Sequence, residues 1–355
     1  MMNTLKMIED LSNCYGAPGF EENMLKTVQS YKGDLSYQRD SMMNCYLNLE
    51  NKQGKNMTIL LDGHLDEVAF MVQNIDEKGL LHFIKLGGWV DHNIPAHLVM
   101  VRNDDGEYIQ GIVTSKPPHF MTEEERAKKI TYQDLQIDVG ATSREEVIND
   151  FKISVSAPIV PFVEFRYNER NQIMMGKAFD NRLGCAAVIE TLKRLQNEDS
   201  VLHVVGALAA QEEVGTRGAQ ITAHRVKPDL AIVFEGSPAD DVYRDQYATQ
   251  GALHGGPQIR HRDNSYVSHQ GFIRFAKSIA KKNDIICQDA VRLSGSTNAG
   301  RIHLSNDGVP TLVLGIATRY VHSHYCYASY RDFEDTVQLA VEIIKEITEE
   351  IITEF

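Results

Sequence analysis

The chain has 355 residues, more than one hydrophobic core usually organises, so we expect two domains. Its hydrophobic fraction of 43% and charged fraction of 24% are ordinary for a globular protein and exclude a largely disordered chain. The formal net charge of −13 argues against nucleic acid or an anionic membrane as the main partner.

The cysteines and the first residues bear on the cellular compartment. The five cysteines are odd in number and form no C-x-x-C pair, so a disulfide framework is not expected. The first ten residues carry charges and lack the apolar stretch of a secretory signal. No run approaches the roughly 18 apolar residues that a membrane span needs. We therefore expect a soluble protein of the cytoplasm.

The first sixty residues predict two helices and then strands. Residues 3–16 carry apolar side chains at helical spacing, APGF at 17–20 interrupts the pattern, and residues 21–31 resume it. Residues 57–63, MTILLDG, form the short apolar run that is typical of a buried strand.

The stretch from residue 69 to 163 has a different sequence pattern. Short apolar segments are separated by DEKG and NDDG, which are hairpin turn signals. Within it, residues 121–134 predict a solvated arm or short helix, because Thr122 and Glu125 have the spacing of a capping box. We predict an inserted small all-β domain over 69–163, interrupting a discontinuous domain made of 1–68 and 164–355.

From residue 176 onward helices and strands alternate. Such alternation predicts an α/β domain with a mainly parallel sheet covered by helices on both faces. The expected helices are 181–196, 215–226 and 332–352, and the expected strands are 202–210, 229–236 and 311–316.

Acidic and histidine side chains follow the predicted strands. The carboxyl ends of strands in an open α/β sheet build the ligand site. Carboxylates and imidazoles gathered there would repel one another and lose solvation without a cation, so a metal is the simplest compensation. Nitrogen and oxygen ligands without thiolate suit zinc, cobalt or manganese, whereas calcium would want more oxygen. The residues concerned are His64, Asp66, Asp180, Glu212, Glu213, Glu235, His322 and His324.

The adjacent glutamates Glu212 and Glu213 can have two different roles. Neighbouring side chains on an extended backbone point to opposite sides, so Glu213 can be a metal ligand while Glu212 acts as general base. In the H-x-D segment, Asp66 is placed to fix the ring of His64 through its second nitrogen.

Each of these residues also has an ordinary interpretation. A Glu-Glu pair in a chain with 49 acidic residues is more often a surface or capping feature. Asp180 could simply cap the helix that follows it. We assign His82, His92, His203 and His224 to structural or surface positions. The functional interpretation depends on the coincidence of so many ligand types at strand ends.

Five segments in this order resemble one known family. GHLDE, KAFDNR, AAQEEVGTRGA, FEGS and RYVHS are similar to those of the dinuclear metallo-aminopeptidases that include glutamyl aminopeptidase and tetrahedral aminopeptidase. The resemblance covers nearly the whole chain. It implies a zinc-peptidase-like catalytic domain and an inserted barrel or PDZ-like domain, which helps to assemble dimers and then a hollow dodecamer.

The resemblance also implies roles for single residues. His64 and Glu235 would hold one metal, Glu213 and His322 the other, and Asp180 would bridge the two. The ions would be divalent, zinc in the first instance, with cobalt or manganese as alternatives. Glu212 would be the base, and the bond between Asp180 and Asn181 is often cis in such enzymes. The implied activity is release of N-terminal residues from peptides.

Two departures keep other activities open. Position 235 is Glu where many members have Asp, a choice that accompanies carboxypeptidase or deacylase activity in related hydrolases. Asn298 stands where an aspartate is expected. A deacylase or carboxypeptidase, or an inactive assembly protein, therefore remain alternatives. Arg319 invites an acidic-substrate hypothesis, although such an arginine is as often structural, and the sequence does not name the preferred N-terminal residue.

Overall fold

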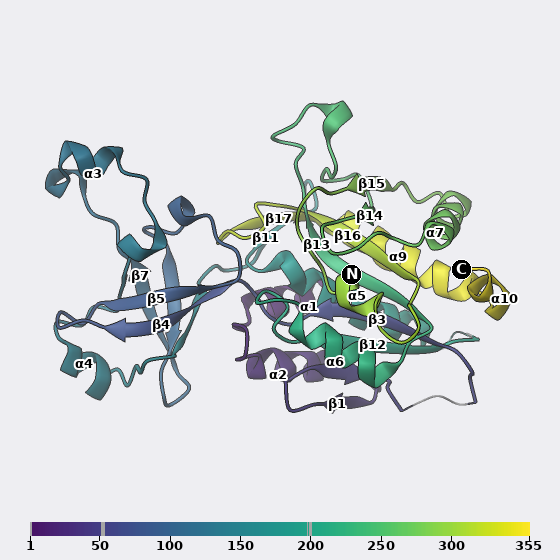
Figure 1. Ribbon diagram of the computed structural model, residues 1–355, viewed down its shortest axis with the longest axis horizontal. Coiled ribbons are helices and arrows are strands. Elements are labelled where there is room, and N and C mark those ends of the chain that lie inside the picture. The colour runs from purple at the N-terminus through teal and green to yellow at the C-terminus, as the bar shows by residue number, and fades with distance from the viewer. Residues whose placement is uncertain (1, 51–53, 197, 199–200) are drawn as a thin grey trace.

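The computed structural model describes residues 2–50, 54–196, 198 and 201–355. A larger α/β part and a smaller β part lie side by side (Figure 1). Within the described chain, no helix combines the length and the apolar character needed to cross a bilayer.

The larger part is built on an eleven-stranded sheet. Its four central strands run parallel in the order β12, β3, β13, β16. Their bounds are His203–Ala209, Thr58–His64, Leu230–Pro238 and Thr311–Arg319. These strands are almost completely buried, as expected for parallel strands that helices cover on both faces.

The flanks of the sheet are mainly antiparallel, so the prediction of a mainly parallel sheet is wrong and the sheet is mixed. The flanking strands are three to five residues long and several are joined by tight hairpins, so they carry too little periodicity to be recognised. They are β1 (Tyr37–Arg39), β2 (Cys45–Leu47), β10 (Arg166–Asn168), β11 (Ile173–Gly176), β14 (Gln258–Arg262), β15 (Gln288–Val291) and β17 (Cys326–Ser329).

Helices cover both faces of the sheet, as predicted. Along β3, Ile59 and Leu61 point into a core formed with α1, α2, α5, α7 and α9, whereas Leu60 points into a second core with α6 and α8. The helices are α1 (Met2–Asn13), α2 (Glu22–Tyr31), α5 (Phe179–Leu195), α6 (Arg217–Val226), α7 (Gln270–Lys282), α8 (Ala299–Ile302), α9 (Tyr330–Glu346) and α10 (Glu349–Thr353).

The predicted helix 332–352 is two helices. Ile347 is extended, with ψ of 136°, and Thr348 begins α10 by accepting a hydrogen bond from the backbone N–H of Ile351. The apolar spacing continues across this break, so the periodicity alone did not reveal it. An N-capping threonine is the local signal for a new helix start.

The smaller part is a closed six-stranded barrel. It has its own apolar core, in which Phe70 stacks on Trp89. The strands are β4 (Ala69–Ile75), β5 (Leu81–Leu86), β6 (Leu98–Arg102), β7 (Tyr108–Val113), β8 (Ile137–Asp138) and β9 (Pro158–Pro161). The helices are α3 (Glu123–Ala127) and α4 (Arg144–Asn149).

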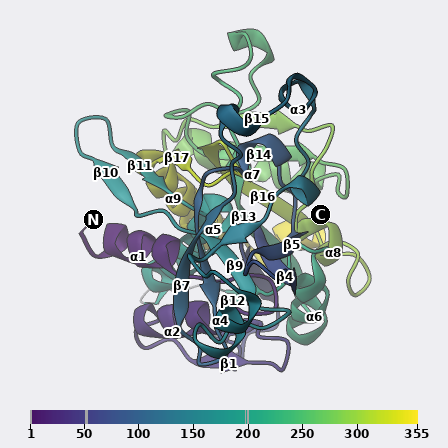
Figure 2. The ribbon, with the colours of Figure 1, turned by 90° about the vertical axis from the view of Figure 1, so that its left-hand side faces the viewer.

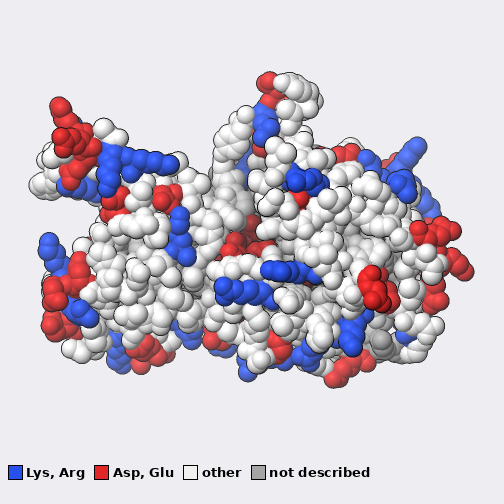
Figure 3. Space-filling view, in the orientation of Figure 1, with Lys and Arg blue, Asp and Glu red and all other residues white. Residues whose placement is uncertain are grey.

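The capping box in the arm is present. Thr122 accepts from the backbone N–H of Glu125, and the Glu125 carboxylate accepts from the backbone N–H of Thr122. The arm carrying α3 extends away from the barrel (Figures 1 and 2). Acidic side chains are visible in the hollow between the barrel and the larger part (Figure 3).

Candidate active site

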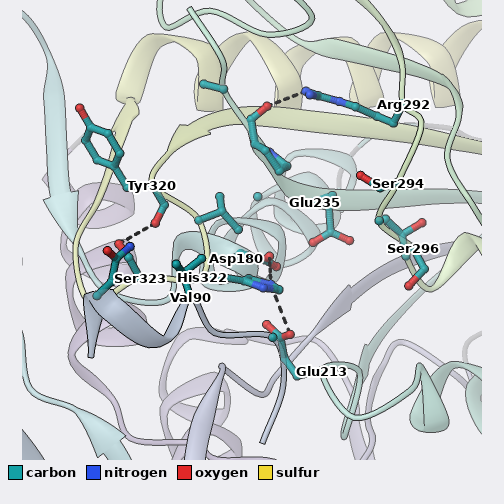
Figure 4. Close-up of a pocket in the computed structure, with 18 of the residues that line it drawn as sticks. Val90, Asp180, Glu213, Glu235, Arg292, Ser294, Ser296, Tyr320, His322 and Ser323 are labelled. Atoms are coloured by element: carbon teal, nitrogen blue, oxygen red, sulfur yellow. Dashed lines mark hydrogen bonds and ion pairs between the residues drawn. The ribbon is translucent and has the colours of Figure 1, made fainter. Parts of the chain in front are cut away.

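The central strands bring the predicted residues to one edge of the sheet. His64 ends β3, Glu212 and Glu213 follow β12, and Glu235 lies near the end of β13. His322 follows β16 and Asp180 lies at the start of α5. Because the four strands are parallel neighbours, their carboxyl ends meet. Asp180, Glu213, Glu235 and His322 converge in one pocket (Figure 4).

Asp180 occupies the centre of this group. Its Oδ1 lies 3.0 Å from Nε2 of His64, and its Oδ2 lies 3.4 Å from Nε2 of His322. His64 is also 3.6 Å from Oε1 of Glu235, and His322 is 3.4 Å from Oε2 of Glu213. One carboxylate therefore faces two imidazoles, each of which faces a second carboxylate.

Two sets of ligand atoms can be distinguished. His64, Asp180 and Glu235 form one, and Asp180, Glu213 and His322 form the other. Within each set the atoms lie within 4.8 Å of one another. These sets coincide with the two that the resemblance implies. A third grouping, His64 with Glu212 and Glu213, has the same compactness.

Burial makes this cluster costly without a cation. Burial raises the pKa of Glu213 to about 8 and that of Glu235 to about 7, and it raises the pKa of Glu212 well above its usual value. Burial alone would lower the pKa of His322, but Glu213 and Asp180 raise it to about 9.

The oxygen atoms of the cluster fit a metal. Oε1 of Glu213 and Oε1 of Glu235 are buried and accept no hydrogen bond from any residue that the structure describes. Buried acceptors of this kind need a partner, and a divalent cation would satisfy both. Mixed imidazole and carboxylate donors suit zinc, cobalt or manganese.

Asp66 joins two of the strand ends. Its Oδ1 accepts from the backbone N–H of Glu212 at 2.9 Å, and its Oδ2 accepts from that of Glu213 at 3.0 Å. Nδ1 of His64 lies 3.4 Å from Oδ1 of Asp66 and 3.1 Å from its backbone carbonyl. Asp66 therefore fixes the backbone of both glutamates beside the ring of His64.

The start of α5 packs directly on β13. A side chain at Gly236 would place a Cβ 2.4 Å from the backbone oxygen of Phe179, so only glycine permits this approach. Asn181 donates to the backbone oxygen of Phe234 and accepts from the backbone N–H of Gly236. The peptide bond between Asp180 and Asn181 is cis, as the resemblance implied.

A second buried group of charges, not predicted from the sequence, includes two residues that flank Asp180 in the chain. Nζ of Lys177 lies 2.6 Å from both carboxylate oxygens of Glu67, and Nη2 of Arg182 lies 2.9 Å from Oε1 of Glu67. All three side chains are at most 1% exposed. The signal was in the sequence, because Lys177 and Arg182 flank Asp180 and Glu67 follows Asp66.

Two predicted substrate residues lie outside the pocket. Asn298 is buried, and its amide donates to Oδ1 of Asp62 at 2.7 Å. Arg319 forms two hydrogen bonds to Asp241, at 2.9 and 2.7 Å, and lines a different cavity beside the β10–β11 hairpin. Neither residue lines the pocket of the acidic cluster. The structure therefore gives no support to a role in substrate binding.

The pocket itself is a cavity of about 1060 Å³ between the sheet edge and the barrel. His92 and His97 of the barrel segment line it together with His324. His92 is exposed, in agreement with its assignment to a structural or surface position. Its place at the pocket could not be predicted, because one histidine in a β-rich segment gives no sign of where its barrel will lie. The sequence did not single out His97 either.

Comparison with known proteins identifies the family. A family model described as M42 glutamyl aminopeptidase matches residues 44–339. The chain belongs to the M42 aminopeptidase family. FrvX of Escherichia coli, which is described as a putative aminopeptidase, is 34% identical over 305 residues, which cover 86% of this chain and 85% of FrvX.

Solved structures support the same assignment. A TET aminopeptidase from a marine sediment Thaumarchaeota archaeon superposes with a TM-score of 0.94 at 34% identity, covering 100% of this chain and 99% of that one. The TET1 peptidase of Pyrococcus horikoshii, described as assembling into a tetrahedron or a large octahedral shell, has a TM-score of 0.86 at 27% identity, covering 97% of this chain and 100% of that one. The resemblance is thus confirmed, and the chain is a peptidase of the M42 aminopeptidase class.

Proposed function

We propose that this M42 peptidase removes N-terminal residues from peptides with the help of two divalent cations. The proposal is carried by the position of Asp180, whose two oxygens face His64 and His322 at 3.0 and 3.4 Å. A single carboxylate between two such pairs is the arrangement that a bridging ligand requires.

His64, Asp180 and Glu235 would hold one cation, and Asp180, Glu213 and His322 the other. We propose zinc, with cobalt or manganese as alternatives. When bound, such ions polarise the scissile carbonyl and lower the pKa of the attacking water. Asp66 keeps Glu212 and Glu213 in place through their backbone N–H groups.

Glu212 would be the general base. Its carboxylate lies 3.9 Å from Nε2 of His64 and lines the pocket. Burial raises the pKa of Glu212, which makes its carboxylate a stronger base. Glu212 would take a proton from the attacking water and give it to the leaving amine, so one carboxyl group serves both halves of the reaction.

The remaining proposals concern organisation. We propose a catalytic domain of residues 1–68 and 164–355, with the barrel of 69–163 as an inserted, PDZ-like oligomerisation domain. Assembly of dimers into a dodecamer is supported by the likeness to TET peptidases. Disulfides are rare in cytosolic proteins, so the five free cysteines support a cytoplasmic location.

The test is hydrolysis of aminoacyl p-nitroanilides with a free or an acetylated α-amine. We expect turnover of the free substrates only. Release of acetate from the acetylated substrates would instead establish a deacylase, and release of the C-terminal residue from an N-acetylated dipeptide would establish a carboxypeptidase. Failure of all three reactions would leave an assembly protein.

Glu212→Gln tests the base. The turnover number should fall by roughly 10²- to 10⁴-fold, because the amide cannot accept the proton. Elemental analysis should find the metal content unchanged. Glu169→Gln, on the exposed β10–β11 hairpin, is the matched control and should be as active as the parent. A near-native rate for Glu212→Gln would show that another acid is the base.

A further inference from the structure

The barrel contributes one wall of the pocket through the segment that follows β5. This segment begins with two adjacent glycines, Gly87 and Gly88, which we call the glycine pair. Gly88 and Val90 line the cavity that also holds Glu213 and His322 (Figure 4). Backbone of the barrel therefore lies at the same cavity as two of the proposed metal ligands.

The glycine pair lies so close to these two ligands that it leaves little room for a side chain. A Cβ at Gly88 would lie 3.0 Å from Nδ1 of His322, and a Cβ at Gly87 would lie 3.2 Å from Oε2 of Glu213. Glu213 and His322 belong to the same set of ligand atoms, which Asp180 completes. The barrel thus packs directly against one of the two proposed metal sites.

His324, two residues after His322, joins the sheet edge to the barrel. The centroid of its ring lies 3.9 Å from that of His97, with 18° between the planes, and 5.1 Å from that of Trp89. The side chain is 1% exposed, and neither ring nitrogen forms a hydrogen bond with any described residue. His324 therefore holds to the barrel by ring packing and not by hydrogen bonds.

Trp89 connects this contact to the glycine pair, which it follows directly in the chain. Its ring stacks on Phe70 of the barrel core, with centroids 4.7 Å apart. Its Nε1 donates to the backbone oxygen of Ala69 at 3.2 Å. Trp89 is thereby fixed within the barrel, so its contact with His324 also fixes the glycine pair relative to the segment that carries His322.

We infer that His324 is a positioning residue for one of the two metal sites. Its contacts with Trp89 and His97 hold the barrel against the sheet edge. The glycine pair then keeps the ring of His322 in the orientation in which Nε2 faces the two carboxylates of its set. The inference rests on the proposed two-cation function, and it gives the barrel a part in the catalytic site in addition to its proposed role in assembly.

Three substitutions test the packing from both ends. His324→Ala removes the ring, whereas His324→Phe keeps an aromatic ring and removes only nitrogens that have no partner among the described residues. Gly88→Ala acts from the barrel, because the added methyl group would meet the ring of His322. His82→Ala is the control, since His82 belongs to the barrel, pairs with Asp76 and does not line the pocket.

Calorimetric titration of the metal-free proteins with Zn²⁺ measures the two sites. The parent, His324→Phe and His82→Ala should bind two ions with the same two dissociation constants. In His324→Ala and Gly88→Ala one constant should rise by about 10- to 100-fold, as is usual when a group that orients a metal ligand is lost, and the other should change far less. Hydrolysis of leucyl p-nitroanilide should fall at limiting zinc and recover in excess zinc, because every ligand is still present.

A purely structural role predicts a different result. His324→Ala would then melt at a lower temperature than the parent in thermal denaturation, but both zinc dissociation constants would be those of the parent. That result would overturn the inference. An His324→Phe variant with the weakened zinc site of His324→Ala would overturn it as well, because ring packing would not be what His324 supplies.

Crystal structures of the metal-free parent and variants separate this inference from the proposed function. If the parent binds no zinc, the two-cation function fails. The positioning role stands in that case if the glycine pair moves away from His322 in His324→Ala and stays in place in His324→Phe. If the glycine pair keeps its place in His324→Ala, the inference is overturned, and the two-cation function stands or falls by the zinc titration of the parent.

Discussion

Two buried groups of charges include residues at the start of α5, and they are compensated in different ways. In the group of Glu67, Lys177 and Arg182, the carboxylate contacts both cations, although Nε and Nη1 of Arg182 donate no hydrogen bond to any described residue. In the group around Asp180, carboxylates outnumber imidazoles, and two carboxylate oxygens accept no hydrogen bond from the described residues. The comparison teaches that burial of charge alone does not mark a ligand site. What marks the acidic cluster is an excess of carboxylates gathered around two imidazoles, which are donor types that bind divalent metals.

Removing the divalent ions should cause the largest loss of stability. After dialysis against a chelator we expect lower stability, because the acidic cluster loses its compensation. An ion present at 100 times its dissociation constant stabilises by about 2.7 kcal/mol, so two sites would give about 5 kcal/mol. Differential scanning calorimetry with and without added zinc, cobalt or manganese measures the shift. Equal melting temperatures in both conditions would contradict the assignment of this cluster as a metal site.

Glu67→Gln removes the anion from the buried group of Glu67, Lys177 and Arg182. The change leaves Lys177 and Arg182 buried without their anion, and breaking such a pair costs about 3–5 kcal/mol. Urea unfolding followed by circular dichroism measures the loss. Asp105→Asn is the control, because its ion pair with Lys152 is half exposed and screened by solvent, so its removal should cost far less stability. Similar losses in both variants would show that the buried group adds nothing beyond a surface pair.

Glu21 is a buried acid outside both groups, and we expect a smaller effect on stability from its substitution. Its Oε1 accepts from the backbone N–H of Gly19 and of Gln211, and its Oε2 has no hydrogen-bond partner among the described residues. Burial, with a contribution from Asp66, raises its pKa from 4.5 to about 7. The folded state therefore holds this proton more tightly than the unfolded state, so stability falls as pH rises from about 4.5 to 7.

Glu21→Gln removes this dependence while keeping an oxygen acceptor. At pH 8 the variant should be more stable than the parent by up to about 3 kcal/mol, and near pH 4 the two should be equal. Urea unfolding at both pH values checks this. A variant that is less stable at pH 8 would mean that ionised Glu21 is stabilised by a partner.

Much of the site could be predicted because it depends on local features. His64, Glu212 and Glu235 end or follow long apolar strands, and such strands are recognisable from the sequence. The same reasoning failed at the edges of the sheet. There β1, β2 and β10 have three residues each, too few for an alternation to be seen.

The two arginines show where prediction stops. Arg319 was noticed in the sequence because it stands three residues before His322. Its hydrogen bond to Asp241 nevertheless keeps it at another cavity. Arg292 stands in no recognised segment and lines the pocket. The position of a guanidinium on a long, flexible side chain depends on its hydrogen-bond partners, and those partners come from distant parts of the chain.

The sequence by itself determined which ligand-type side chains end the central strands, because apolar runs and the residues after them are local properties. Only the tertiary structure decided which charges stand together and which remain unpaired. The physical reason is that the pairs joining Lys177 to Glu67 and Arg319 to Asp241 span 110 and 78 residues. No local pattern reports such distances.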